Sequence, residues 1–119
     1  MKKFEFDYDK ENDDLFLYDK KFKSSASVEI DDLVVDFNRT KGMVGIEIMN
    51  ATRFLGNLVT GYKITKKNLS GLMACEIDAK VVNNLLFLKM ILVFTEDRKI
   101  PINLSVPRIT KSSPALAAF

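Results

Sequence analysis

Apolar and polar residues alternate with a period of two along most of the first half of the chain. Phe4, Phe6 and Tyr8 alternate with acidic residues, the polar segment 9–14 interrupts them, and apolar residues return at 15–18. Alternation on both sides of a polar turn is typical of a β-hairpin with one buried face. The beginning of the chain therefore predicts two antiparallel strands.

The same alternation resumes after a lysine-rich loop and predicts three more strands. Apolar residues alternate with polar ones at 28–30, at 33–37 and at 44–48. An Asp-Asp pair separates the first two of these segments, and a polar stretch that ends in glycine separates the last two. Both separators are typical of turns between strands.

The apolar period changes after the last of these strands, where two short helices are predicted. Asn50 stands at the N-cap position and Gly56 at the closing position of a helix near residues 50–56. Thr65 is the corresponding N-cap of a second helix near residues 65–71, which ends at a glycine.

The second half predicts a three-stranded meander whose register follows from its turns. Residues 73–81 alternate, and Asn83 and Asn84 suit a two-residue hairpin turn because asparagine tolerates a positive φ. This turn places an isolated lysine of the middle strand opposite an acidic residue. It predicts three cross-strand pairs, which are Val82 with Leu85, Val81 with Leu86, and Asp78 with Lys89.

The third strand of the meander is predicted to share its apolar face with the middle strand. The residues concerned are Ile100, Ile102, Leu104 and Val106 on the third strand and Leu88, Met90 and Leu92 on the middle one. They share a face only if the connection at 95–99 contains an odd number of residues, because a two-residue turn would reverse every side chain. We therefore expect a loop of three or five residues.

The middle strand carries a second apolar face, which is the candidate interaction site of the chain. Its residues are Leu85, Phe87, Ile91 and Val93, placed around Lys89. A strand that is apolar on both faces is usually covered on both. We favour the first half of the chain as the cover, because a small domain has few other elements to use. The alternative cover is another subunit, which would make these four residues an interface.

These elements predict a β-rich α+β fold of antiparallel hairpins and meanders with two short helices. A chain of 119 residues suits one domain. We expect a single domain over residues 1–119 with four parts, which are a β half at 3–56, a helical connection at 57–71, a three-stranded meander at 72–107 and a tail at 108–119.

The net charge of +2 conceals an uneven distribution. Residues 1–60 contain 9 Lys and Arg against 12 Asp and Glu, which gives −3, and residues 61–119 contain 9 against 4, which gives +5. A solvated surface is the ordinary interpretation, and head-to-tail association or a basic patch for an acidic partner are the functional ones. The candidate patch consists of Lys63, Lys66, Lys67, Arg98, Lys99 and Arg108.

Nucleic acid is not the favoured partner of this patch. The isoelectric point of about 8.6 is below that of typical nucleic-acid-binding domains. The aromatic residues occur at core spacing, so no stacking platform is visible in the sequence. Weak nucleic-acid binding is retained as an alternative.

The composition argues against an enzyme. The chain contains no histidine, which excludes Ser-His and Cys-His activation and histidine metal sites within it. Its glycines never reach the spacing of a phosphate-binding loop. Cys75, the single cysteine, lies on the apolar side of its strand and is expected to be a buried structural thiol. The acidic segment 7–14 matches a calcium loop only in part, so we interpret it as a solvated turn. We expect no cofactor and no bound metal.

Three segments of the chain occur in a recognisable order. They are Tyr8-Asp9-Lys10-Glu11-Asn12-Asp13-Asp14-Leu15-Phe16, Asp32-Leu33-Val34-Val35-Asp36-Phe37 and Gly42-Met43-Val44-Gly45-Ile46-Glu47-Ile48-Met49-Asn50-Ala51-Thr52. In this order they resemble the prokaryotic family called domain of unknown function 2283, over about residues 3–56. Phe16 stands where the family usually has Tyr, and Thr52 where it usually has Ser. The resemblance implies a small β-rich fold without an assigned activity, and for some members a role as the partner of a small toxin-like protein.

The favoured function is a non-catalytic interaction module that binds a second copy of itself, as a homodimer, or a small protein. An antitoxin-like partner of a small toxin is the narrower alternative that the resemblance implies. The N-terminus lacks the pattern of a signal peptide, and the longest apolar run, at 85–94, is about half the length that spans a bilayer. We therefore expect a cytoplasmic protein that does not contact a membrane.

Overall fold

The alternating segments pair into one eight-stranded antiparallel sheet with two short helices, which is the β-rich α+β fold that the sequence predicts. The computed structural model describes residues 1–95 and 98–106. The strands are β1 (Lys2–Asp9), β2 (Asp14–Tyr18), β3 (Ala26–Ile30), β4 (Leu33–Asn38), β5 (Gly42–Ile48), β6 (Ala74–Val82), β7 (Leu85–Thr95) and β8 (Arg98–Val106), and the helices are α1 (Ala51–Leu58) and α2 (Lys66–Ser70).

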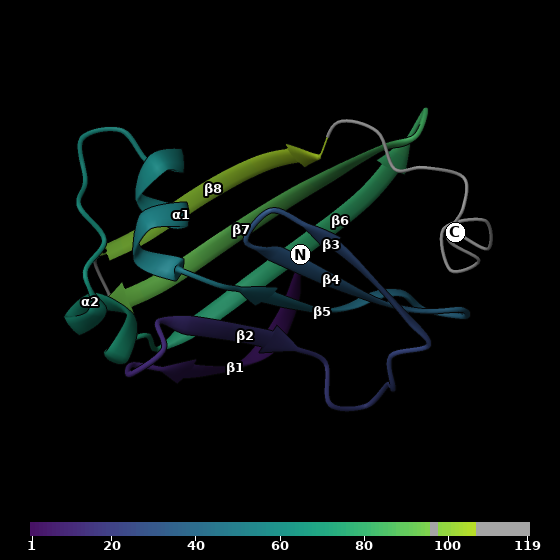
Figure 1. Cartoon of the computed structure of the whole chain (residues 1–119), viewed down its shortest axis with the longest axis horizontal. Coiled ribbons are helices and arrows are strands. Elements are labelled where there is room, and N and C mark those ends of the chain that lie inside the picture. Colours follow the sequence, from purple (N-terminus) through teal and green to yellow (C-terminus); the bar gives the residue numbers. More distant parts are fainter. Residues whose placement is uncertain (96–97, 107–119) are drawn as a thin grey trace.

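The first strand joins the two halves of the chain. The order of the strands is β3-β4-β5-β2-β1-β6-β7-β8. Residues Glu5–Asp9 of β1 pair with β2, and its residues Lys2–Phe4 pair with β6. The second half therefore extends the sheet of the first half instead of packing over it (Figure 1).

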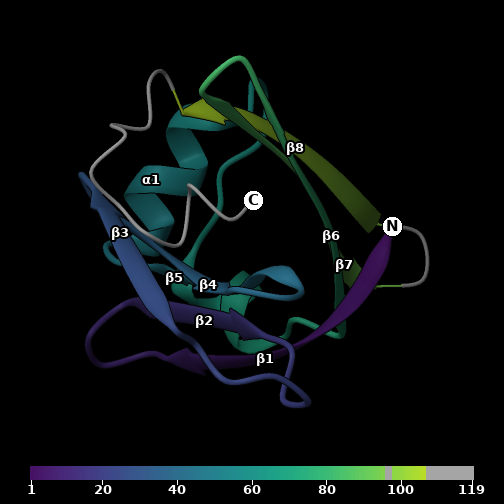
Figure 2. The same ribbon diagram turned by 90° about the vertical axis from the view of Figure 1, so that its right-hand side faces the viewer.

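The sheet is curled into a half-barrel whose concave side holds the core. Figure 2 shows the strands curving around the interior, with α1 on the open side between the edge strands β3 and β8. The inward side chains are mostly aliphatic, and their burial is the main driving force for folding. The largest fully buried ones are Phe37, Leu15, Leu17, Leu33, Ile46, Ile48, Leu55, Leu69, Ile77, Leu86, Leu88 and Met90.

The hairpin of β6 and β7 has the predicted turn and register. Asn83 and Asn84 have φ angles of 51° and 66°, and a two-residue type I′ turn requires such positive values at both positions. The three predicted pairs are present, which are Val82 with Leu85, Val81 with Leu86, and Asp78 with Lys89. Asp78 and Lys89 are direct neighbours across the strands, but the described residues contain no ion pair between them.

The shared face of β7 and β8 is confirmed, but the predicted loop between them is wrong. Leu88 pairs with Leu104, Met90 with Ile102, and Leu92 with Ile100. The two strands continue to Thr95 and Arg98, which pair with each other and leave only residues 96–97 between them. The register shifts between Val93 and Thr95, and this β-bulge supplies the extra residue that keeps the apolar side chains on one face.

Both predicted helices are present, but α1 differs in detail. It continues through Gly56 for two more residues, so this glycine does not end it. Asn50 has a φ of 49°, and its side chain does not cap the helix but donates to Asp32 Oδ1 at 3.1 Å. In α2 the predicted N-cap is confirmed, because Thr65 and Asn68 form a reciprocal capping box.

Cys75 is the buried structural thiol that the sequence predicts. Its side chain is fully buried and donates to the carbonyl oxygen of Phe4, with 3.4 Å between sulfur and oxygen. Burial raises the pKa of the thiol to about 12, so it stays protonated and is a poor nucleophile at neutral pH. Met73, which the alternation assigns to the same face, is 58% exposed because β6 begins only after it.

Candidate interaction surfaces

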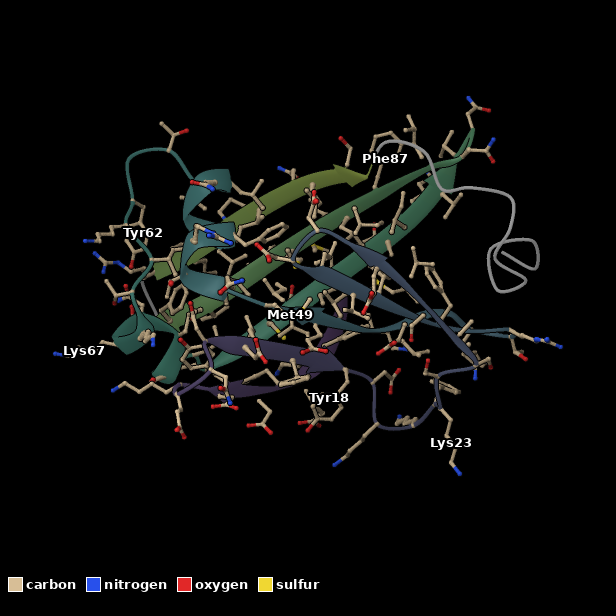
Figure 3. The ribbon with its side chains drawn as sticks, in the orientation of Figure 1. Tyr18, Lys23, Met49, Tyr62, Lys67 and Phe87 are labelled. Atoms are coloured by element: carbon tan, nitrogen blue, oxygen red, sulfur yellow. The ribbon has the colours of Figure 1, made fainter. Side chains whose placement is uncertain are left out.

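The four candidate interface residues lie together on the outer side of the sheet. Along β7 the residues that point inward are buried, and those that alternate with them point outward. Phe87 is 43% exposed, and Leu85, Ile91 and Val93 are half-buried. Figure 3 shows Phe87 at the end of β7 that is remote from the helices. We define the outer face as Leu85, Phe87, Lys89, Ile91 and Val93 with their neighbours Glu76, Asp78, Lys80, Lys99, Asn103 and Ser105.

Both signs of charge flank the apolar side chains of the outer face. The strand pairing places each β7 residue between one residue of β6 and one of β8: Phe87 between Lys80 and Ser105, Lys89 between Asp78 and Asn103, and Ile91 between Glu76 and Pro101. A shallow depression crosses the rows of Phe87 and Lys89. Val93 has Lys99 beside it on β8. The outer face is therefore an apolar strip with two acidic residues, Glu76 and Asp78, and three basic ones, Lys80, Lys89 and Lys99.

The first half of the chain does not cover the outer face, so that expectation is wrong. β1 pairs with the free edge of β6, and the backbone hydrogen bonds of this pairing keep the first half in the plane of the sheet. The elements expected to cover the outer side instead extend the sheet, and Phe87 stays exposed.

The described part of the predicted basic patch gathers at the end of the molecule that carries the helices. Helix α2 and the start of β8 lie at this end (Figure 1), where Figure 3 labels Lys67. The described members are Lys63 before α2, Lys66 and Lys67 in its first turn, and Arg98 and Lys99 at the start of β8, whereas Arg108 lies outside the described residues.

Tyr62 holds one cation of this patch. The guanidinium carbon of Arg98 lies 5.0 Å from the centre of the Tyr62 ring, and its Nη1 donates to the Tyr62 hydroxyl at 3.1 Å. Shallow hollows flank the ring, one towards α1 and one towards the start of β8. Ring and hydroxyl are both in contact with Arg98, so Tyr62 acts here as a structural contact.

Asp13 is the residue with a role that the sequence did not reveal. Its carbonyl oxygen accepts from the Ala51 amide at 2.9 Å. Its carboxylate accepts from the Thr52 amide at 3.2 Å, from the Thr52 hydroxyl at 2.6 Å and from the Tyr8 hydroxyl at 2.6 Å. The β1–β2 turn thus caps α1, a task that the sequence assigned to Asn50.

These contacts shift the pKa values of Asp13 and Tyr8 in opposite directions. Burial alone would raise the pKa of Asp13, but the hydrogen bonds from Thr52 and Tyr8, with the charge of Lys66, hold it below its ordinary value. Burial and the bond to Asp13 raise the pKa of Tyr8. The Asp13 carboxylate is thereby engaged within the protein, and no cluster of three metal-ligating side chains occurs among residues 1–95 and 98–106.

Acidic side chains reduce the electrostatic field of the basic patch. Lys66 is near enough to Asp13 for its charge to act on that carboxylate. Arg53, in α1, lies with its Nη2 3.2 Å from Asp32 Oδ2. The helical end therefore carries both signs of charge, and part of its positive charge is balanced internally.

The comparisons with known proteins give a family and do not name an activity. Residues 5–51, which comprise most of β1 and the segment up to the first residue of α1, match the family described as "Protein of unknown function (DUF2283)". An uncharacterised protein of Methanocaldococcus jannaschii, MJ0789, is 34% identical over 97 residues, which cover 82% of this chain and 78% of the relative. The chain belongs to this family. In this DUF2283 member, the acidic β1–β2 turn and the small residue Thr52 at the start of α1 are in direct contact. Asp13 of the turn accepts hydrogen bonds from the hydroxyls of Tyr8 and Thr52.

The remaining comparisons add two findings. No solved structure matches the chain. Within the part of the chain that the structure describes, no helix is both long enough and apolar enough to cross a membrane.

Proposed function

We propose that this DUF2283 protein is a non-catalytic interaction module whose outer face binds a second copy of the chain. The observation that carries the proposal is the partly exposed strip of Leu85, Phe87, Ile91 and Val93, flanked by charges of both signs. Soluble monomers rarely expose contiguous large apolar side chains, and such a strip within a polar rim is typical of a protein interface.

A dimer contact of standard size would cover a small part of the surface of this chain. A standard interface buries about 800 Å² on each partner, which is about one tenth of the 7402 Å² accessible surface of this chain. Phe87 is the most exposed of the four apolar residues, so it has the most surface left to bury and would be the main anchor.

The charges favour a second copy over an unrelated partner. A two-fold symmetric contact places the same patch on both sides, so the patch must be complementary to itself. The acids Glu76 and Asp78 lie on one face with the bases Lys80, Lys89 and Lys99, so each acid can face a base of the second copy. A face with a single sign of charge would repel its own copy.

A catalytic role has little support. The chain has no histidine, the Cys75 thiol is buried with a raised pKa, and the Asp13 carboxylate is engaged by Thr52 and Tyr8. A small protein, including a toxin-like one, would use the same outer face and is an outcome of the test below.

The test is the solution mass, measured by light scattering over a range of concentrations. We expect the wild type to have about twice the 13.5 kDa of the chain, and Phe87→Glu to be a folded monomer because the new carboxylates would be buried in the contact. The matched control is Tyr18→Glu, which adds the same charge at an aromatic residue that is 39% exposed and lies outside the outer face.

Three results would contradict the proposal. A wild type that is monomeric at all concentrations excludes self-association. Equal loss of the dimer in both variants would place the contact elsewhere or reflect charge alone. A monomeric wild type that binds a small protein through Phe87 would replace the second copy with a different partner.

A further inference from the structure

The charges of residues 1–60, which we call the family-like half, are separated between the two ends of its strands. In an antiparallel sheet, successive turns alternate between opposite ends. The β1–β2 and β3–β4 turns lie at the end that carries α1, and the β2–β3 and β4–β5 loops lie at the other end (Figure 1). The first end has the acids Asp9, Glu11, Asp13, Asp31 and Asp32 with the base Lys10, and the other end has the bases Lys20, Lys21, Lys23, Arg39 and Lys41 with the acid Asp19. The net charge of −3 for residues 1–60 hides this separation.

The two ends differ in how their charges are balanced. At the acidic end, Asp13 caps α1 and Asp32 is paired with Arg53. At the basic end, Asp19 is paired with Lys2 and Glu5 lies near Lys20, while Lys23 and Arg39 form no side-chain ion pair with any described residue. Part of the positive charge at this end is therefore not balanced by an ion pair.

The two basic loops are held together. The Asn38 side-chain amide donates to the Lys23 carbonyl oxygen at 2.9 Å. The Phe22 ring contacts cations from two other segments, with the Lys2 ammonium 5.1 Å and the Lys41 ammonium 5.3 Å from the ring centre. The cations are thus positioned by the fold, which lowers the entropy cost of placing them against a multivalent anion.

A hollow lies beside these loops and combines lysines with aromatic rings. It is lined by Lys2, Lys3, Glu5, Tyr18, Asp19, Lys20, Lys21 and Phe22, and we call it the lysine–aromatic hollow. Two of these lining residues are acids, so the four lysines leave the hollow with an excess of positive charge. Asp19 forms an ion pair with Lys2, and Glu5 lies 3.9 Å from the Lys20 ammonium.

Tyr18 offers an open ring in this hollow. It is 39% exposed, although most aromatic residues in the sequence occur at core spacing. Its cross-strand neighbours are Glu5 on β1 and Gly45 on β5, and the Asp36 carboxylate lies over Gly45. Figure 3 shows Tyr18 and Lys23 along the same lower margin of the molecule.

We propose that the lysine–aromatic hollow binds single-stranded nucleic acid. Lysines of β1 and of the β2–β3 loop would contact successive phosphates, and a base would stack on Tyr18. A positive surface next to an accessible aromatic ring is the combination that sequence-tolerant single-strand binding uses. An acidic peptide would have no use for an open ring, and a membrane surface would favour apolar side chains that insert, whereas Phe22 is held between lysines.

This proposal is independent of the dimer, because the hollow and the outer face share no residue. The experiment measures the fluorescence anisotropy of a labelled 12-nucleotide oligothymidylate titrated with the full chain. We expect binding whose log K falls with log[salt] at a slope of about −2 to −3, as for three or four phosphates.

Separate variants test the Tyr18 ring and the lysines of the hollow. Tyr18→Ala should weaken binding about 5- to 150-fold, the loss expected for one stacked base, and Tyr18→Phe should restore it because the ring remains. Lys20→Glu combined with Lys21→Glu should abolish binding. The matched control reverses the same two charges on α2, Lys66→Glu with Lys67→Glu, and should leave binding unchanged. Phe87→Glu should also bind, which distinguishes this result from that of the dimer test.

Several results would overturn the proposal. One is the absence of oligonucleotide binding at low salt by a wild type that is folded by circular dichroism. Another is equal loss in the α2 control, which would place the contact at the helical end. Equal competition by polyglutamate would identify an acidic protein as the ligand, and binding to phosphatidylserine vesicles but not to the oligonucleotide would identify a membrane.

Discussion

The Asp13 carboxylate connects β1, its own turn and α1. It accepts hydrogen bonds from the Tyr8 hydroxyl and from both the amide and the hydroxyl of Thr52. These bonds satisfy donors at the start of a helix, where the chain itself provides no acceptor. Because the carboxylate is charged and near the positive end of the helix, each bond is stronger than a neutral one.

Removal of this carboxylate should destabilise the whole fold. We expect Asp13→Ala to lower the free energy of unfolding by about 1–2 kcal/mol, the range for loss of a helix cap, measured by urea denaturation. Glu11→Ala is the matched control, because Glu11 is an exposed acid in the same turn. An equal effect of the two substitutions would mean that the net charge of the turn matters and the cap does not.

The same residue gives a prediction for the dependence on pH. The pKa of Asp13 is lower in the folded chain than its ordinary value of 3.8. Its contribution to stability is therefore complete above pH 3.8 and is lost as the pH falls through the lower folded pKa. We expect Asp13→Asn to unfold with a shallower dependence on pH below about 4 than the wild type, in thermal denaturation at a series of pH values. Identical slopes would contradict this role.

Single-residue roles could be predicted where the contact is local. The sequence indicated that Thr65 caps α2, and its partner Asn68 is three positions away. It also indicated burial of Cys75, because the alternation around it is strong. The cap of α1 could not be found in this way, because Asp13 and Thr52 are 39 positions apart. Asn50 satisfied the local rule but adopts a left-handed backbone.

At the scale of elements, the β6–β7 hairpin has a register that its own turn determines. Asn83 and Asn84 both adopt positive φ, and this geometry fixes which residues face each other along the strands. The sequence contained that information within two residues. The bulge near the end of β7 was not predicted, because no turn residue marks it and the apolar pattern alone allowed a longer loop.

Two substitutions of Asn84 should show how far the positive φ of this residue strains the backbone of the folded protein. We expect Asn84→Gly to stabilise the protein by a few tenths of a kcal/mol to about 1 kcal/mol, because glycine adopts positive φ without a steric cost and Asn-Gly is the preferred type I′ pair. Asn84→Val should destabilise it by about 1 kcal/mol or more. Thermal denaturation measures both. A lower midpoint for the glycine variant than for the wild type would show that the asparagine side chain itself is required.

The order of the strands could not be predicted from the sequence. Each hairpin was predictable from neighbouring residues, but the pairing of β1 with β6 joins residues more than 70 positions apart. The apolar pattern of β7 correctly indicated two apolar faces, and it could not tell an internal cover from a partner. The pairing of β1 with β6 is the observation that argues against an internal cover of the outer face.

At the scale of the whole molecule, the two halves share one sheet through β1. Phe4 lies where they meet: it is only 6% exposed, it pairs with Cys75, and its carbonyl oxygen accepts from the Cys75 thiol. A shared strand of this kind favours unfolding of the chain as one cooperative unit. The expectation of a single domain can be tested at this position.

We expect Phe4→Ala to lower the free energy of unfolding by about 3–5 kcal/mol, the usual cost of truncating a buried phenylalanine. The loss should be the same whether it is measured by hydrogen exchange of amides in β4, in the family-like half, or in β7. Phe6→Ala is the control, because Phe6 is half-buried and pairs with β2, and its loss should be smaller. If amides of β7 lose protection in Phe4→Ala while those of β4 keep theirs, the halves unfold separately and β1 is only a contact between two units. Equal loss in both halves would mean that a binding event at the outer face or at the lysine–aromatic hollow stabilises the entire chain.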